Sequence, residues 1–235
     1  MILLLNHNLQ VKIKELSTAE GYNQWAPIYE HNENPLMALD EIAFKENVEP
    51  VLEDEKIADL GCGTGRFSVM LSALGAEVTG VDASKGMLEI AKTKTSNSIS
   101  FIQHDLSKPL PLENNYFDKV ISTLVLEHIP DLLLFFNEIK RICKPQGSIY
   151  ISGMHPAMML KGNRANFTDP LTGEEVRPKG YDHQLSDFVI NISKAGLEIE
   201  GMKEYNGNQE LAKQFPKAEK YLHWPMLVIF KLKAK

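Results

Sequence analysis

A short apolar run followed by alternating glycines constrains this chain more than any other feature. Residues 57–60 are apolar except for a single acid, Asp59, which predicts a buried strand. Glycines occupy every second position from Gly61 to Gly65, and residues 66–74 then show apolar side chains at helical spacing. A glycine turn between strand and helix lets the backbone approach a ligand closely, because glycine lacks a side chain and tolerates unusual dihedral angles. The stretch therefore predicts a strand–turn–helix unit built around a ligand.

The residues around the glycines disfavour a phosphate ligand. A dinucleotide-binding loop requires glycine or alanine where Arg66 stands, and a P-loop requires Gly-Lys followed by serine or threonine. Asp59 would repel a pyrophosphate, whereas it suits a ligand with an ammonium or sulfonium charge. Asp82 ends the next predicted strand, about 20 residues after the loop, where an acid can bind ribose hydroxyls. Loop and acids together predict a ligand that carries a ribose and a positive charge.

At this point the chain resembles the class I S-adenosylmethionine-dependent methyltransferases, in particular their small-molecule, type 11-like group. The matching motifs lie between residues 55 and 152 and are Asp59-Leu-Gly-Cys-Gly-Thr-Gly65, Gly80-Val-Asp-Ala-Ser84 with Met87-Leu88, His104-Asp-Leu106, Phe117-Asp118, Leu126-Glu-His128 and Lys144-Pro-Gln-Gly147. The resemblance implies an α/β, Rossmann-like sheet of seven mostly parallel strands with the last strand antiparallel and helices on both faces. It also implies S-adenosylmethionine as cofactor and methyl transfer as the reaction.

The resemblance and the positions of the motifs indicate a set of cofactor-binding residues. Met87 is expected to form an apolar shelf for the adenine, although it could simply pack in the core. Asp105 follows a predicted strand and is expected to accept a hydrogen bond from the adenine amine. His128 is expected to form part of the cofactor wall rather than to act as a base. The set in the central part of the chain is Asp59, Gly61, Cys62, Gly63, Gly65, Asp82, Ala83, Met87, Asp105, Leu106, Thr123, Leu124 and His128.

Two segments outside this core are expected to cover the site. Residues 18–50 are predicted to form an N-terminal helical cap, in which Tyr22, Trp25 and Tyr29 share one helical face. These aromatic residues either pack the cap onto the sheet or cover the ligand, and we expect at least one of them to contact the cofactor. Residues 154–183 follow the fifth predicted strand and are interrupted by glycines and prolines, which is typical of a lid. This insertion brings further roof candidates, namely Met158, Met159, Phe167 and Tyr181.

The acceptor atom, and whether a general base is used at all, stay open at this level. A base is needed for an unionised hydroxyl, an acidic carbon or a protonated amine, but a carboxylate acceptor needs none. The candidates are His155 and His183, whose ordinary pKa lies close to neutrality, although His155 could merely end a strand and His183 cap a helix. The sequence after the fourth strand, residues 122–125, lacks the Asn/Asp-Pro-Pro-Tyr/Phe motif of enzymes that methylate bases or glutamine amides. A nucleic-acid base is therefore a disfavoured acceptor.

Length and charge are consistent with one domain that acts on a small molecule. The chain has 235 residues, a formal net charge of −6 and a pI near 5.7, which disfavours a nucleic-acid partner. Only two cysteines occur, Cys62 and Cys143, so we expect a reducing, cytoplasmic setting. The apolar start, residues 1–5, is too short for a signal peptide, and no window reaches the length of a membrane span. The seven histidines suggest no metal site, residues 1–17 have no assigned role, and the oligomeric state is not predicted.

Two other functions are compatible with parts of this pattern. A non-catalytic adaptor could bind S-adenosylmethionine with the same fold, although the nucleotide half is intact. A nicotinamide oxidoreductase is contradicted by Arg66 and Asp59. Comparing the binding of S-adenosylmethionine with that of NADH distinguishes a methyltransferase from an oxidoreductase. Turnover on a panel of small acceptors distinguishes an enzyme from an adaptor. The leading hypothesis is an S-adenosylmethionine-dependent methyltransferase acting on a small, partly apolar molecule.

Overall fold

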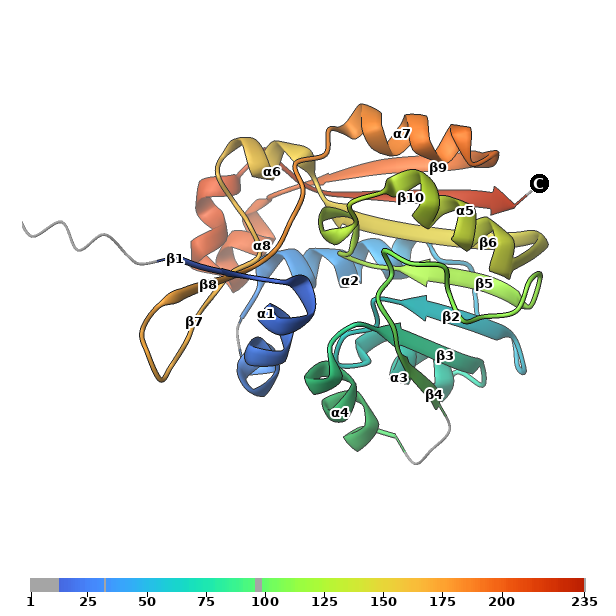
Figure 1. Cartoon of the computed structure of the whole chain (residues 1–235). Coiled ribbons are helices and arrows are strands. Elements are labelled where there is room, and N and C mark those ends of the chain that lie inside the picture. Colours follow the sequence, from blue (N-terminus) through green and yellow to red (C-terminus); the bar gives the residue numbers. More distant parts are fainter. Residues whose placement is uncertain (1–12, 32, 96–98, 235) are drawn as a thin grey trace, which may run out of the picture.

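A seven-stranded sheet runs through the middle of the molecule (Figure 1). The computed structural model describes residues 13–31, 33–95 and 99–234. All neighbouring strands are parallel except β10, which is antiparallel to both β6 and β9. The expected sheet with an antiparallel last strand is confirmed. In spatial order the strands are β4 (Ile99–Gln103), β3 (Glu77–Asp82), β2 (Lys56–Leu60), β5 (Phe117–Ser122), β6 (Cys143–Met154), β10 (Pro225–Ala234) and β9 (Leu197–Asn206).

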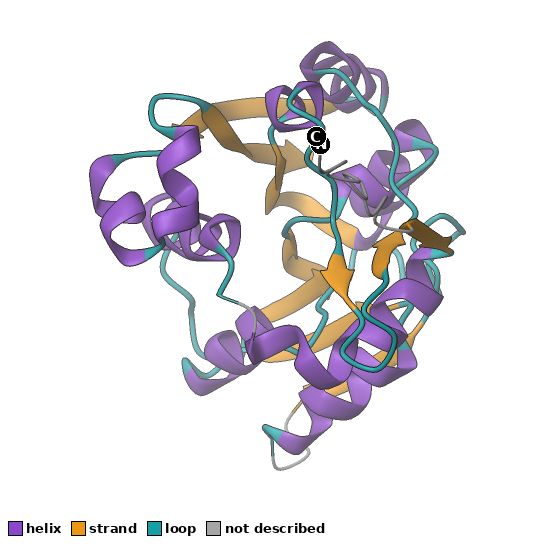
Figure 2. Ribbon diagram, turned by 90° about the vertical axis from the view of Figure 1, so that its left-hand side faces the viewer, coloured by secondary structure: helices purple, strands orange, loops and turns teal. Residues whose placement is uncertain are grey.

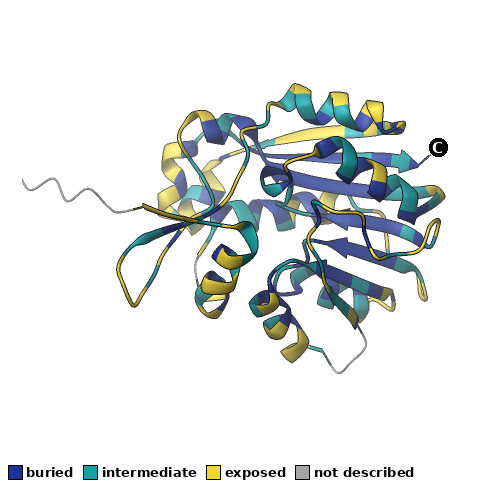
Figure 3. Cartoon of the chain, in the orientation of Figure 1, coloured by how far each residue is buried: buried dark blue, intermediate teal, exposed yellow. Residues whose placement is uncertain are grey.

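Helices cover both faces of the sheet, as the turned view in Figure 2 shows. One face carries α2 (Pro35–Asn47) and α3 (Arg66–Ala73), and the other carries α5 (Leu132–Ile142) and α7 (Leu185–Lys194). Each pair buries an apolar face against the strands, which accounts for the near-continuous burial of β2, β5 and the second half of β6. Figure 3 shows this burial in the central strands, while the edge strand β9 is largely exposed.

Side-chain caps determine where the helices begin. Ser84 accepts a hydrogen bond of 3.1 Å from the Met87 N–H at the start of α4 (Lys85–Thr93), as its position in the sequence predicts. Asp131 does the same for α5 by accepting from the Leu134 N–H at 3.0 Å. Since α4 begins directly after β3, its first turn lies at the carboxyl edge of the sheet.

Most of the expected cap, residues 18–50, forms helices, and the type of helix or its start changes near Pro27 and Pro35. The segment consists of α1 (Thr18–Trp25), the 3-10 helix η1 (Ala26–His31) and α2, which begins at Pro35. Proline is favourable at that first position because its missing N–H would have no partner there. The first part of the segment, α1 and η1, packs over the carboxyl edge of the sheet, where both contact α4.

A second, three-stranded sheet joins the start of the described chain to the insertion. Its order is β1 (Ile13–Leu16), β8 (Glu175–Pro178) and β7 (Phe167–Thr168), with β1 and β8 parallel. The insertion also contains α6 (Pro156–Leu160), so it is more regular than its glycines and prolines suggest. Local sequence could not indicate this, because β8 pairs with a strand far earlier in the chain. Residues 1–12 of the expected leader lie outside the described residues.

The remaining elements connect β9 to β10 and cover the end of the large sheet. They are α8 (Gln209–Gln214) and the 3-10 helix η3 (Pro216–Tyr221). Within residues 13–31, 33–95 and 99–234, no helix combines the length and apolar character that a membrane crossing requires. In the same ranges, no three histidine, cysteine or acidic side chains converge in a way that could hold a metal ion.

Candidate active site

A cavity of about 710 Å³ lies at the carboxyl ends of β2, β3, β4 and β5, where open α/β sheets bind their ligands. It is walled by the glycine loop on one side and by the N-terminal helices and the insertion on the other. Of the expected cofactor-binding residues, only Trp25 and Gly65 do not line it. Those that do are Tyr22, Tyr29, Asp59, Gly61, Cys62, Gly63, Asp82, Ala83, Met87, Asp105, Leu106, Thr123, Leu124 and His128.

The glycine loop has a backbone that side chains would disturb in two different ways. Gly61 has a φ of 76°, and a Cβ there would lie 2.2 Å from the Val125 Cγ2 atom, so packing excludes a side chain. Gly63 has a φ of 53°, and a Cβ there would meet no atom within 4 Å. Because Gly63 lines the cavity, that space belongs to the cavity itself. The loop therefore leaves room for a ligand to lie against its backbone, which fits an adenosyl cofactor.

Asp82 fastens this loop to the start of α4. Its two carboxylate oxygens accept hydrogen bonds from the Gly63 N–H at 2.9 Å and the Ser84 N–H at 2.8 Å. Burial raises the pKa of Asp82 above its ordinary value, although these two N–H groups act in the opposite direction. A carboxylate has further lone pairs beyond the two used here, so Asp82 can also accept hydrogen bonds from a ligand in the cavity.

Asp59 is a buried acid beneath the loop. Its side chain is 2% exposed and accepts a hydrogen bond of 2.6 Å from the Ser68 hydroxyl. Burial raises the pKa of Asp59 from 3.8 to about 6, despite the opposing effects of Ser68 and Arg66. Asp59 is thus mainly a carboxylate at neutral pH, and its charge favours positive charge in the adjoining cavity.

Arg66, which departs from the dinucleotide-binding pattern, connects α3 to α2. Its guanidinium donates to the Asp40 carboxylate of α2 and, at 3.2 Å, to the Met37 carbonyl. Asp40 is completely buried and also accepts from the Ser152 hydroxyl of β6. The sequence offered Arg66 only as evidence against a phosphate, so this role was missed.

On the side expected to hold the adenine, Met87 and Asp105 lie in different environments. Met87 is 1% exposed and lines the cavity from the first turn of α4. One Asp105 oxygen accepts from the Ser107 N–H at 2.9 Å and the Ser107 hydroxyl at 2.7 Å, and the other lies 3.8 Å from the Lys108 ammonium. Partial burial raises the pKa of Asp105, but the Ser107 hydrogen bonds and the Lys108 charge bring it below its ordinary value. Asp105 is therefore charged and held in a turn.

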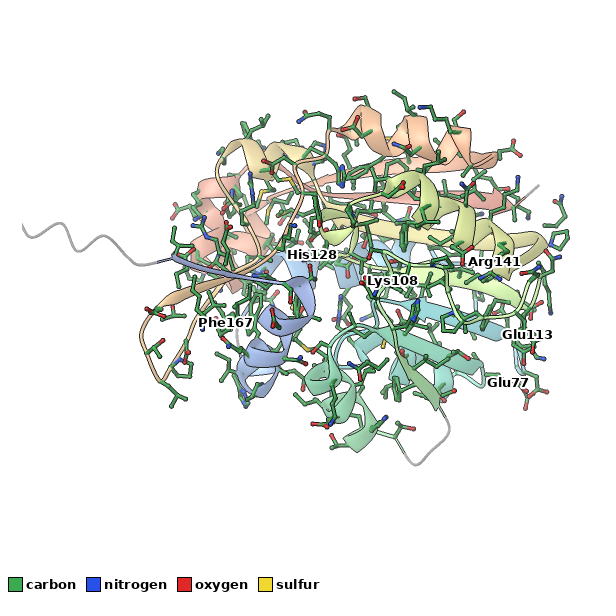
Figure 4. All side chains as sticks on the ribbon, in the orientation of Figure 1. Glu77, Lys108, Glu113, His128, Arg141 and Phe167 are labelled. Atoms are coloured by element: carbon green, nitrogen blue, oxygen red, sulfur yellow. The ribbon has the colours of Figure 1, made fainter. Side chains whose placement is uncertain are left out.

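Tyr22 and His128 close the opposite wall. The Tyr22 hydroxyl lies 2.9 Å from His128 Nε2, and His128 Nδ1 lies 2.7 Å from the Lys179 carbonyl oxygen. A carbonyl only accepts, so Nδ1 carries the hydrogen, and Nε2 of the neutral ring accepts from the Tyr22 hydroxyl. His128 thus joins α1 to the end of β8. Figure 4 shows His128 and Lys108 near the point where α1 approaches the sheet, and both line the cavity.

The three expected aromatic residues have unequal positions. Tyr22 and Tyr29 line the cavity with ring centroids 6.1 Å apart, edge to face. Trp25 lies behind them, stacked on Tyr22 at 5.6 Å and on Phe167 of β7 at 5.1 Å, and is 6% exposed. Phe167 therefore backs the aromatic wall rather than facing the cavity (Figure 4). Tyr181 does line the cavity, as the roof expectation requires.

The two histidines expected as bases are engaged elsewhere. His155 caps α6 by accepting from the Ala157 N–H at 3.0 Å, and its Nε2 lies 2.6 Å from Glu204 of β9. His183 donates from Nε2 to the Ile129 carbonyl at 2.7 Å. Neither side chain lines the cavity in the described part of the chain. The structure therefore does not bring them to the residues around Asp82.

Other cavity residues were not expected from the sequence. About half of them belong to or directly adjoin one of the sequence motifs, which is the signal that could have found them, and the others carry no such signal. Met158 and Met159, expected in the roof, instead pack with Leu211 and β10. The unexpected lining residues are Ser17, Thr18, Ala19, Met37, Thr64, Arg66, Phe67, Gln103, His104, Ser107, Lys108, Val125, Ile129, Pro130 and Lys179.

A sheet with this strand order, with a glycine loop after β2 and an acid at the end of β3, defines a Rossmann-like protein of the methyltransferase class. Residues 58–151 match the family model described as a methyltransferase domain. An uncharacterised methyltransferase of Emericella nidulans is 32% identical over 243 aligned residues, which cover 85% of this chain and 84% of that protein. The chain therefore belongs to the S-adenosylmethionine-dependent methyltransferases, and S-adenosylmethionine is its cofactor.

Two further comparisons show where the similarity is concentrated. A ubiquinone biosynthesis O-methyltransferase of Bartonella tribocorum is 30% identical over 139 residues, and this chain spans only 56% of its length. A solved S-adenosylmethionine-dependent methyltransferase from Mesorhizobium loti superimposes with a TM-score of 0.70 over 85% of this chain and 100% of that chain. At 23% identity this second likeness concerns the fold alone.

Proposed function

We propose that the protein transfers the methyl group of S-adenosylmethionine to a small, partly apolar acceptor. The observation that carries this proposal is the cavity of about 710 Å³, which falls in the roughly 300–1,000 Å³ range of small-molecule sites. Its outer wall consists of aromatic and aliphatic side chains such as Tyr22, Ile129 and Tyr181. Such a wall suits an acceptor with an apolar part, and it comes from the cap, the segment between β5 and α5 and the insertion rather than from the glycine loop.

In this proposal the residues around the loop hold the cofactor. When bound, S-adenosylmethionine supplies a methyl group on a positively charged sulfur. Asp82 accepts hydrogen bonds from the ribose hydroxyls, and Met87 lies against the adenine. Gly63 leaves space for the remaining part of the cofactor. Asp59 provides negative charge beneath the loop.

The cap and the insertion act on the acceptor. Tyr22, His128 and the Lys179 carbonyl keep these two segments together over the cavity. A closed wall excludes water and restricts how an acceptor can lie, and such positioning can lower a barrier by roughly 7–11 kcal/mol in well-oriented systems. The relative that is named for ubiquinone biosynthesis supports a small acceptor, but its similarity covers only part of the chain.

The same proposal includes the setting of the protein. Residues 1–235 act as one methyltransferase domain, with 18–50 as cap and 154–183 as lid. Both cysteines, Cys62 and Cys143, are buried free thiols, which suits a reducing cytoplasm. The net charge of −6 supports a small-molecule acceptor over a nucleic acid.

A metabolite panel with labelled cofactor tests this function. We expect release of S-adenosylhomocysteine that depends on one small acceptor. Gly63→Val should abolish it, because the side chain fills cavity space and penalises a backbone with positive φ. Binding of S-adenosylhomocysteine without turnover on any metabolite fraction would instead favour the non-catalytic adaptor.

A further inference from the structure

Lys179 is a cavity residue whose charged end the proposed function does not use. It follows β8 in the insertion, is exposed, and lines the cavity. Among the residues that the structure describes, no carboxylate forms an ion pair with its ammonium. The other lysine and the arginine of the cavity wall are both paired, since Lys108 lies 3.8 Å from Asp105 and Arg66 binds Asp40. Lys179 thus offers an unpaired positive charge at the cavity.

Three hydrogen bonds fix the backbone of Lys179 at the cavity wall. Its N–H donates to the Leu16 carbonyl of β1 at 2.9 Å. Its carbonyl accepts from the Thr18 hydroxyl at 3.1 Å and from His128 Nδ1 at 2.7 Å. Thr18 begins α1 and His128 ends the 3-10 helix η2 (Leu126–His128), so three separate segments position this residue. The side chain therefore starts from a fixed point where the cap meets the insertion.

The charged end of Lys179 lies beside an aromatic and apolar part of the wall. Its ammonium is 5.3 Å from the centroid of the Tyr181 ring, and that residue also lines the cavity. Ile129 and Pro130, which follow His128 in the chain, add apolar lining. An aromatic ring attracts a cation only weakly, so an incoming anion gains a charge-assisted hydrogen bond. An incoming ammonium would meet like charge instead, so the position selects against it.

The acidic side chains of the cavity lie on the other side. Asp59 and Asp82 belong to the surroundings of the glycine loop, and Asp105 follows β4. The proposed function assigns this side to the cofactor. Of the described residues, those that line the cavity from the cap and the insertion include no acid, and Glu127 of η2 is buried without lining it. The cover of the cavity therefore presents the charge of Lys179 without a nearby acid in the wall.

We propose that Lys179 binds a carboxylate of the methyl acceptor, which is an organic acid with an apolar body. One ammonium balances the single charge of a carboxylate, and Tyr181, Ile129 and Pro130 contact the apolar body. The proposal rests on the proposed function and narrows its class of acceptor. Lys179 binds and orients the acceptor and takes no part in the transfer of the methyl group.

The variant for the test is Lys179→Met, which keeps most of the length of the side chain and removes its charge. Lys220→Met is the matched control, because Lys220 is also exposed and its ammonium lies 4.9 Å from the ring of the neighbouring Tyr221, but it does not line the cavity. Titration calorimetry with S-adenosylhomocysteine should give affinities within about twofold for wild type and both variants. A larger loss in Lys179→Met alone would assign Lys179 to the carboxylate of the cofactor and overturn the proposal.

Equilibrium probes test the acceptor position without turnover. With S-adenosylhomocysteine bound, wild type and variants are titrated with benzoate and with benzamide, its uncharged counterpart of similar shape, and followed by NMR. We expect wild type to bind benzoate at least about fivefold more tightly than benzamide. Lys179→Met should lose this preference, whereas Lys220→Met and the charge-retaining Lys179→Arg should keep it. No saturable binding of benzoate to wild type, no preference in wild type, or an unchanged preference in Lys179→Met would overturn the proposal.

Turnover distinguishes failure of this proposal from failure of the proposed function. The acceptor found in the metabolite panel should be an acid, and Lys179→Met should raise its KM at least about fivefold with kcat within a few-fold. A neutral or cationic acceptor, or an unchanged KM, would overturn the role of Lys179 and leave the proposed function standing. Absence of any acceptor counts against the proposed function, whereas the probe titrations still decide the role of Lys179.

Discussion

At the scale of single residues, the site depends on two acids that differ in exposure and in their partners. Asp82 lines the cavity and accepts hydrogen bonds from the Gly63 and Ser84 N–H groups. Asp59 is buried and accepts from Ser68. These positions predict a structural and binding role for Asp82 and an electrostatic role for Asp59.

Asp82→Asn is expected to weaken S-adenosylhomocysteine binding at least tenfold. Hydrogen bonds to a charged acceptor contribute about 1.5–3 kcal/mol, and the amide keeps only part of them. Titration calorimetry measures the affinity, and circular dichroism checks that the fold is retained. Unchanged affinity in the folded variant would show that the ribose does not contact Asp82.

Asp59→Asn is expected to change how stability depends on pH. Because the pKa of Asp59 is raised from 3.8 to about 6, the folded protein holds a proton that the unfolded chain releases between these values. This contribution to stability is present below about pH 4 and is lost as the pH rises to about 6, with an upper limit of about 3 kcal/mol. The free energy of unfolding of Asp59→Asn should therefore exceed that of wild type by an amount that grows between pH 4 and 6 and then stays constant.

Chemical denaturation across this pH range measures the free energy of unfolding. Asp118→Asn is the control, because the contribution of Asp118 to stability depends on pH in the opposite direction. Partial burial raises the pKa of Asp118, but hydrogen bonds from Lys144 and the Lys56 N–H bring it below its ordinary value. The stability that Asp118 contributes is consequently lost as the pH falls. A difference for Asp59→Asn that does not vary with pH would contradict the buried-acid assignment.

At the scale of elements, the cover of the site consists of α1 and the insertion, and a few side-chain contacts hold it in place. Arg66 and Asp40 join α3 to α2, and His128 joins the loop after β5 to α1 and to the end of β8. Asn23 of α1 accepts hydrogen bonds from the Gly86 N–H and the Ser84 hydroxyl at the start of α4. These contacts hold the cap against α3 and α4, next to the glycine loop.

Arg66→Met should destabilise the protein by about 3 kcal/mol or more, because it leaves the completely buried Asp40 carboxylate without its cation. Lys45→Met is the matched control. Its pair with Glu41 also lies in α2 but is exposed, so its loss should change stability by less than about 1 kcal/mol. Equal effects in denaturant titrations would mean that the buried pair does not fasten α2.

Tyr22→Phe should loosen the cover while leaving the sheet intact. The change removes the hydroxyl that His128 Nε2 accepts from, at a cost of about 1 kcal/mol. We expect faster amide hydrogen exchange in α1 and at residues 178–181, with exchange in β2 and β3 unchanged. Uniformly faster exchange would indicate a general loss of stability instead.

The sequence indicated the cavity residues around the glycine loop better than those of the cover, and whether they bind the cofactor stays a prediction. Gly63, Asp82 and Met87 belong to contiguous motifs whose spacing is set by one strand and the next helix, so local pattern suffices. Lys179 contributes through its backbone carbonyl, which no residue type reveals. His155 and His183 satisfied the chemical criterion for a base, but helix capping and a carbonyl contact engage them away from the cavity. Such long-range contacts are not visible in local sequence.

At the scale of the whole molecule, the cavity connects parts of the chain that are distant in sequence. The glycine loop follows β2 in the interior of the large sheet, whereas the cover combines α1 with the insertion after β6. A ligand that contacts both parts should stabilise the folded protein as a whole, in proportion to its affinity.

S-adenosylhomocysteine at 100 times its dissociation constant should stabilise the protein by about 2.7 kcal/mol, seen as a raised melting temperature. NADH at the same concentration should have no effect, because Arg66 and Asp59 disfavour its pyrophosphate. Stabilisation by NADH would revive the oxidoreductase alternative. The Gly63→Val variant, which lacks the cavity space beside the loop, should show no shift with either ligand.

The parallel pairing of β1 with β8 also sets the order in which the molecule can be completed during its synthesis. The contact from Thr18 to the Lys179 carbonyl spans 161 residues, so at about 5–20 residues per second the ribosome needs roughly 10–30 s to deliver the second partner. Closing so long a loop is entropically costly and slow, whereas β2 to β5 are joined by short crossovers. The nascent chain therefore passes through a stage in which the glycine loop and α1 have been synthesised but the insertion has not, so that it could hold cofactor without fully shielding an acceptor from water.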